Sequence, residues 1–171
     1  MKLGSFYFIE EQYFKEFPDE RLMKNKEFIN GVEHNRPAYY SFLDIKTNIY
    51  WLIPISSQVD KYKKIYNDKI SKNKSCDTIV FGYVLGKEKA FLIQNMCPIT
   101  PKYIRNVYID KATGEDVCIN EKLKKELEKK AKKVLRLIRN GYSKLVFPDV
   151  LAIENKLLED KLLEDKLLED K

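Results

Sequence analysis

Histidine is almost absent from this chain, and its few cysteines have no metal-binding spacing. The one histidine, His34, lies in a polar segment and belongs to no HxH or HExxH pattern. Cys76, Cys97 and Cys118 are far apart and lie in or beside apolar runs, so we expect three buried free thiols in a reducing compartment. The sequence therefore argues against a metal site, a Ser-His-Asp hydrolase and a Cys-His nucleophile.

Glycine-rich loops and long apolar runs are absent as well. The six glycines are isolated turn markers, so the chain has neither a P-loop nor a GxGxxG motif. No apolar run approaches the ~20 residues that a membrane-spanning helix needs. Glu10 and Glu11 interrupt the N-terminal segment before a signal-peptide core can form. We therefore expect a cytoplasmic protein without a cofactor.

Positive charge and aromatic side chains, by contrast, are abundant. The 171 residues carry 32 Lys and Arg against 26 Asp and Glu, a net charge of +6. Residues 156–171 contribute four lysines and six acids, so residues 1–155 alone carry +8. This charge favours a polyanionic partner, either nucleic acid or an anionic membrane surface. The 11 tyrosines and 9 phenylalanines could stack on bases, although packing in the core is the default for most of them.

Hydrophobic periodicity and turn residues predict an α+β fold. We expect a strand at residues 6–9, helical turns at 10–17 and a long polar loop at 18–36. The expected hairpins pair residues 38–45 with 48–55, 77–85 with 89–93, and 107–109 with 116–119. One helix starts at Gln58, and a second runs from its cap at Asn120 to about Asn140, with Gly141 as its stop. Together these elements predict a small, strongly curved antiparallel sheet with helices packed on it.

The second helix and the tail differ in how their apolar residues repeat. The helix has a regular core stripe, formed by Leu123, Leu127, Ala131, Val134, Leu135 and Ile138. Residues 156–171 repeat Lys-Leu-Leu-Glu-Asp three times, and a five-residue period turns a helix by about 140° per repeat, so the leucines spiral around it. We therefore expect one domain over residues 1–155 and a peripheral helical tail over 156–171, of which at most the first copy packs.

A candidate site for phosphate chemistry lies between residues 35 and 57. Arg36 precedes a proline, and Ser56 and Ser57 stand where a strand meets a lysine-rich helix. A helix start offers free N–H groups to a phosphate, and RNA supplies its own nucleophile in the 2′-OH. Plainer roles remain open: Ser57 as the cap of a Ser57-Gln58-Val59-Asp60 capping box, Arg36 as a surface charge, and His34 as a loop side chain rather than a general base.

Several short motifs resemble the ToxN/AbiQ endoribonucleases, which are toxins of type III toxin–antitoxin systems. The matching pieces are Phe6-Tyr7, an aromatic first helix containing Tyr13, Arg36-Pro37-Ala38-Tyr39, the segment 50–57 and Asn95-Met96-Cys97-Pro98. Their order and spacing cover roughly residues 5–145, and the chain looks closest to the CptN-like branch. The resemblance implies a barrel-like fold similar to the MazF/Kid toxins. It also implies metal-independent RNA cleavage that leaves a 2′,3′-cyclic phosphate and a 5′-hydroxyl.

The resemblance further implies partners and residue roles. The partners are a pseudoknotted RNA antitoxin made from repeats, which the toxin processes and with which it closes into a ring-like assembly, and cellular or phage mRNA as substrate. The active-site residues fall on Arg36, Ser56 and Ser57. The family often continues with Ser-Pro-Lys, where this chain has Gln58-Val59, so Lys61, one helical turn after Ser57, is the expected substitute.

We expect RNA to contact a set of basic and aromatic residues: Tyr13, Tyr39, Lys63, Lys64, Lys102, Arg105, Lys125, Lys129 and Lys132. For the lysines of the second helix, a solvated surface is the competing interpretation. Two other functions remain open for the whole chain. One is a non-catalytic RNA-binding regulator, and the other is a peripheral membrane protein anchored by the leucine repeats. The net negative charge of the tail argues against the membrane protein, because it does not favour binding to anionic lipids.

Overall fold

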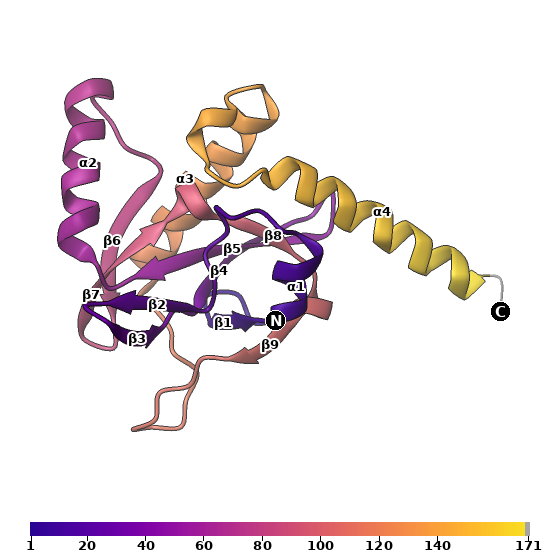
Figure 1. Cartoon of the computed structure of the whole chain (residues 1–171), viewed down its shortest axis with the longest axis horizontal. Helices are drawn as coiled ribbons and strands as arrows, with labels where there is room; N and C mark the ends of the chain where they lie inside the picture. Colours follow the sequence, from indigo (N-terminus) through magenta and orange to yellow (C-terminus); the bar gives the residue numbers. More distant parts are fainter. Residues whose placement is uncertain (170–171) are drawn as a thin grey trace.

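A computed structural model describes residues 1–169 and has an antiparallel sheet with helices packed around it (Figure 1). Its strands are β1 (Phe6–Ile9), β2 (Lys26–Ile29), β3 (Val32–Asn35), β4 (Ala38–Asp44), β5 (Ile49–Ser56), β6 (Ile79–Val84), β7 (Lys87–Leu92), β8 (Cys97–Ile99) and β9 (Ile104–Val107). Its helices are α1 (Glu11–Glu16), α2 (Val59–Asn73), α3 (Glu121–Arg139) and α4 (Val150–Glu169), with 3₁₀ turns η1 (Ile93–Asn95), η2 (Pro101–Tyr103) and η3 (Ser143–Leu145). The expected α+β fold is confirmed.

The main sheet is open rather than closed into a barrel. Its strands follow the order β6-β7-β5-β4-β1-β9, and β5 also pairs with β8. The two edge strands, β6 and β9, form no ladder with each other within the residues described. The barrel-like closure that we expected is therefore not found, and the similarity to MazF/Kid toxins stays a prediction.

Strand β5 organises the sheet because it has partners along its whole length. It pairs with β4 on one side, and on the other side first with β8 and then with β7. Six of its eight residues are apolar and buried, including Trp51, Leu52 and Ile53 with no exposed surface. This buried run leads directly into Ser56 and Ser57, so a rigid strand fixes the position of both hydroxyls.

Helix α3 covers the sheet through the apolar stripe expected from the sequence, and all six residues of that stripe are buried. The Asn120 side chain accepts a hydrogen bond from the Leu123 N–H, and Gly141 has a left-handed φ of 96°, so both helix ends are as predicted. A Cβ added at Gly82 on β6 would lie 2.1 Å from Leu123 Cδ2. Glycine at this position therefore lets the strand and α3 approach closely.

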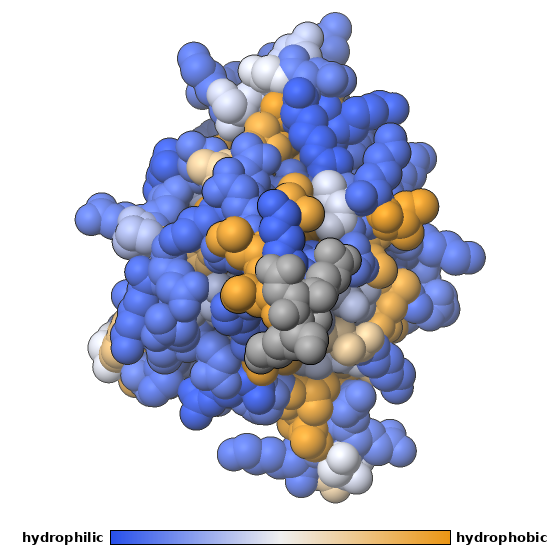
Figure 2. All heavy atoms as spheres, turned by 90° about the vertical axis from the view of Figure 1, so that its right-hand side faces the viewer, coloured by the Kyte–Doolittle hydropathy of each residue, from blue (hydrophilic) through white to orange (hydrophobic). Residues whose placement is uncertain are grey.

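Helix α4 runs through the predicted boundary at residue 155 without a break and projects away from the body (Figure 1). Leu157 in the first repeat is only 2% exposed, whereas Leu162, Leu163 and Leu167 are about 60% exposed or more. Among the repeat leucines whose burial is described, the first copy therefore holds the buried one. Figure 2 shows this side of the molecule as mostly hydrophilic, with separate hydrophobic groups. No helix within residues 1–169 is both long and apolar enough to cross a membrane.

Two local predictions are wrong, and a third holds only in part. The loop expected at residues 18–36 contains the β2–β3 hairpin, which turns at Asn30-Gly31. The hairpin expected from residues 107–109 and 116–119 is reduced to a short reversal, in which an antiparallel bridge joins Ile109 to Asp116, because β9 ends at Val107 and pairs with β1. Cys118 is exposed, whereas Cys76 and Cys97 are buried free thiols as expected. In each case the residues are too polar, or the paired segment is too short, for hydrophobic periodicity to predict the secondary structure or the burial.

Candidate active site

Arg36, Ser56 and Ser57 come together around a buried carboxylate that the sequence analysis did not single out. The Glu27 carboxylate accepts hydrogen bonds from Arg36 Nη2 at 2.7 Å, from the Ser56 hydroxyl at 2.8 Å and from the Ser57 backbone N–H at 3.0 Å. The side chains of Glu27 and Arg36 are 2% and 11% exposed. A carboxylate with three donors, one of them a guanidinium, holds the end of β5 and Arg36 in one fixed arrangement.

Glu27 reaches this position because the β2–β3 hairpin places it there. Asn30 and Gly31 have φ values of 50° and 77°, and left-handed conformations at both turn positions suit a two-residue hairpin. The hairpin is then tied to the entrance of β4, because the Arg36 N–H donates to the Asn25 carbonyl at 2.6 Å. Arg36 Nη1 also donates to the Lys24 and Lys26 carbonyls, at 3.4 and 3.3 Å. The polar hairpin is thus a support for the site.

A second cation lies beside Ser57, on a strand that is distant in sequence. Ser56 pairs with Ala90 in the β5–β7 ladder, which brings the next residue, Ser57, beside Lys89. The Lys89 ammonium donates a hydrogen bond to the Ser57 hydroxyl. The only sequence signal for this contact was the expected strand at residues 89–93, and its register with β5 could not be read from the chain.

Burial and neighbouring charges shift the pKa values of Glu27 and Lys89. Burial raises the pKa of the Glu27 carboxyl, but the hydrogen bonds from Ser57, Arg36 and Ser56 outweigh it, so the pKa lies below its ordinary value. Burial lowers the pKa of Lys89, and the nearby Glu27 opposes this change only in part. Glu27 is therefore an anion at neutral pH, and Lys89 releases its proton more readily than a free lysine.

The residues joined by these hydrogen bonds form the Glu27 cluster, which consists of Glu27, Arg36, Ser56, Ser57 and Lys89. Lys61 does not join this cluster. It is exposed in the first turn of α2, and its ammonium lies 5.6 Å from the Tyr62 ring centroid. The capping box is not formed either, because α2 starts at Val59 and no side chain caps it. The Ser56 hydroxyl instead accepts a hydrogen bond from the Gln58 N–H at 3.1 Å. Lys89, rather than Lys61, lies where the second cation was expected.

Tyr13 and Tyr39 do not offer faces to RNA, since neither side chain has any exposed surface. The Tyr13 hydroxyl donates to the Pro98 carbonyl at 2.7 Å, and the Tyr39 ring packs between Phe6 and Phe91. Their expected stacking on bases is therefore wrong for this structure. Both rings are taken up by hydrophobic packing, since Tyr39 lies on β4 inside the main sheet and the Tyr13 ring of α1 packs against Phe17 and Tyr103.

The basic residues expected to contact RNA are all on the surface but differ in their partners. Lys63, Lys102 and Lys132 form ion pairs with Glu88, Glu164 and Glu128. Within the part of the chain that the structure describes, four others form no ion pair: Lys64, Arg105, Lys125 and Lys129. RNA contact by these seven residues stays a prediction.

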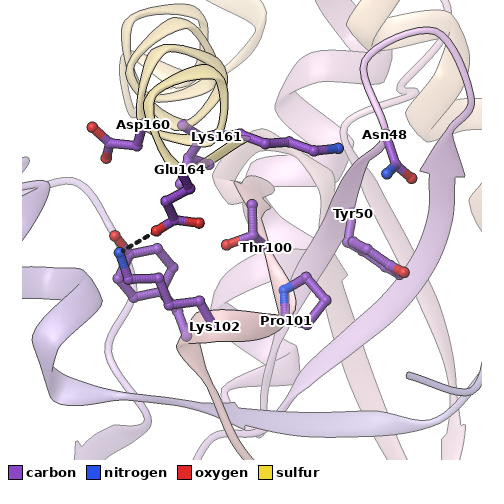
Figure 3. Close-up of a pocket in the computed structure, with 10 residues that line it drawn as sticks. Asn48, Tyr50, Thr100, Pro101, Lys102, Asp160, Lys161 and Glu164 are labelled. Carbon is purple, nitrogen blue, oxygen red and sulfur yellow. Dashed lines mark hydrogen bonds and ion pairs between the residues drawn. The ribbon is translucent and has the colours of Figure 1, made fainter. Parts of the chain in front are cut away.

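A separate pocket of about 270 Å³ lies between α4 and the start of β5 (Figure 3). Tyr50, Thr100 and Pro101 line it on the sheet side, and Lys102 bridges to Glu164 of α4 at 3.2 Å. Tyr50 is near the first residue of β5, whereas Ser56 is its last. This pocket is therefore at the other end of the strand from the Glu27 cluster.

Comparison with known proteins finds a similar fold without close sequence similarity. No protein-family model matches the chain, and no curated protein matches it either. A solved structure that does match is that of AbiQ, described as a lactococcal anti-phage endoribonuclease belonging to the type III toxin–antitoxin system. The TM-score is 0.61 at 17% identity, over 96% of this chain and 99% of the other. The resemblance noted from the motifs is confirmed at the level of the fold.

Proposed function

We propose that this chain is an endoribonuclease toxin of a type III toxin–antitoxin system and that it cleaves RNA without a metal ion. The observation that carries the proposal is the convergence of Arg36, Ser56, Ser57 and Lys89 at the end of β5. The fold shared with AbiQ supports it, as does the positive charge of the body. Hydroxyls and cations suit a reaction in which RNA provides the nucleophile.

In this proposal the scissile phosphate contacts the Ser57 hydroxyl and the Lys89 ammonium, whose residues, unlike Glu27 and Ser56, are not fully buried. Glu27 and Ser56 are positioning residues, because both are buried and act by holding Arg36 and Ser57. Arg36 adds a permanent positive charge behind the phosphate. A fixed arrangement of donors and charges favours a transition state in which negative charge builds up on phosphorus-bound oxygens.

Lys89 then has two tasks in the cleavage step. The 2′-oxygen forms a bond to phosphorus while the bond from phosphorus to the 5′-oxygen breaks, which gives a 2′,3′-cyclic phosphate and a 5′-hydroxyl. The Lys89 ammonium stabilises the pentacoordinate phosphorane and donates a proton to the leaving 5′-oxygen. Its lowered pKa makes it a better acid than a free lysine.

The proposed partners are RNA molecules. A repeat-derived, pseudoknotted RNA antitoxin would be processed by the toxin, remain bound across the site and close toxin copies into a ring-like assembly. The substrates would be cellular or phage mRNA, and cleavage would abort phage infection. The surface cations Lys64, Arg105, Lys125 and Lys129 are available to bind the phosphate backbone.

Incubating the purified chain with long RNA in EDTA tests this function. We expect fragments with 2′,3′-cyclic phosphate ends, and we expect Ser57→Ala to lose cleavage while it still binds the RNA transcribed from repeats upstream of its own gene. A folded chain that binds long RNA but leaves it intact would instead be a non-catalytic RNA-binding regulator. Loss of cleavage in EDTA with recovery in magnesium would overturn the metal-independent mechanism.

A further inference from the structure

The single histidine lies on the site-facing side of the β2–β3 hairpin. In the antiparallel ladder Glu27 is directly opposite His34, and directly opposite residues have their side chains on the same face. The ion pair between Lys26 and Glu33, 2.6 Å long, joins two side chains of the other face and so confirms the alternation. Glu27 points at Ser56 and Ser57, so His34 projects from the same face as a residue of the cluster.

Strand alternation places His34 beside a second site residue. Arg36 follows His34 by two positions, which puts the two side chains on the same side of an extended chain. Arg36 in turn contacts Glu27. The side chains of Glu27 and Arg36 are only 2% and 11% exposed, whereas His34 is exposed. Among these three ionisable side chains, His34 is therefore the one open to an RNA strand on the cluster.

We propose that His34 is the general base of the cleavage reaction, which rests on the function proposed above. Its neutral imidazole accepts the proton of the 2′-OH as the 2′-oxygen bonds to phosphorus, and Lys89 gives a proton to the 5′-oxygen as that bond breaks. One proton is taken and one is given, so the step is balanced. Imidazole is the side chain that acts most often as a general base in enzymes. The buried Glu27 carboxylate has no surface from which to do so.

A substrate with a sulfur in place of the 5′-oxygen separates the two roles. Thiolate leaves without a proton, so such RNA needs a base but no acid. We expect Lys89→Ala to lose about 10²–10⁴-fold on ordinary RNA and to lose clearly less on the sulfur substrate. The loss that remains there is the part that comes from stabilisation of the phosphorane. We expect His34→Ala to lose a similar factor on both substrates and to regain part of its rate when imidazole is added.

Glu33→Ala is the matched control, because it changes the neighbouring residue on the opposite face of the same hairpin. It should keep the wild-type rate on both substrates. A wild-type rate for His34→Ala would overturn the proposal, and so would its recovery on the sulfur substrate or a loss that imidazole cannot restore. If the wild-type chain cleaves neither substrate, the proposed function itself fails, which is a different result.

Discussion

Replacing Glu27 by alanine should destabilise the whole fold, although the residue belongs to a polar hairpin outside the main sheet. The change removes the acceptor for Arg36, for the Ser56 hydroxyl and for the Ser57 N–H. Arg36 then keeps its charge in a place where its side chain is 11% exposed. Removing one partner of a buried ion pair costs about 3–5 kcal/mol, because the remaining charge has lost its compensation.

That cost is large compared with the stability of an ordinary domain. Native domains have unfolding free energies of about 5–15 kcal/mol. For a chain of this length each kcal/mol shifts the midpoint of thermal unfolding by about 2–4 °C, so Glu27→Ala should lower it by roughly 6–20 °C. Thermal and urea unfolding followed by circular dichroism measure both quantities. Glu33→Ala, which removes an exposed ion pair from the same hairpin, should cost about 0–1 kcal/mol.

A double-mutant cycle identifies the cause. If the cost comes from the unpaired guanidinium, Arg36→Met should be destabilising in the wild-type chain but nearly neutral in Glu27→Ala. Acid provides a second check. Because the folded-state pKa of Glu27 is lowered, its stabilisation is present above the unfolded-state pKa of about 4.3 and is lost as the pH falls through the folded value. A cost below 1 kcal/mol at neutral pH, or additive effects of the two mutations, would refute this account.

Three further predictions concern other parts of the molecule. Cleavage should fall as the pH rises through the lowered pKa of Lys89, hence below the value of about 10.4 for a free lysine, and a pH–rate profile checks this. Leu157→Ala should cost about 2–5 kcal/mol because this leucine is 2% exposed, whereas removing residues 161–171 should change the unfolding free energy by much less. Gly82→Ala should cost about 1–3 kcal/mol in urea unfolding, since its methyl would meet Leu123.

The sequence predicts well the elements that bury an apolar face. Strands β4 and β5 and helix α3 carry apolar residues at the spacing of their own secondary structure, and the structure has them within one or two residues of the expected bounds. Ser56 and Ser57 were predicted at the end of β5 for the same reason. Aromatic residues say less about function, because the sequence shows the same residue type whether its ring stacks on a base or, like that of Tyr13, fills the core.

Hydrophobic periodicity does not predict the other two residues of the site, Lys89 and Glu27. Lys89 meets Ser57 through a ladder register, and a shift of one residue would have turned it to the other side of the sheet. Helical spacing from Ser57 predicts Lys61 as the second cation, but α2 starts only at Val59, and Ser57 is held by Glu27 and Lys89 before the helix begins. Contacts across strands, rather than along one helix, decide which cation the serine receives.

The β2–β3 hairpin explains why Glu27 in particular was missed. Its residues show no apolar alternation, because one face holds the charged pair Lys26–Glu33 and the other carries Glu27 and His34 towards the site. A hairpin that supports polar chemistry needs no apolar face, so periodicity cannot detect it. The Asn30-Gly31 pair was the one available signal, since it is a preferred turn of two-residue hairpins. In a segment expected to be a loop, such a turn is therefore better evidence for a functional hairpin than the hydrophobicity of its strands.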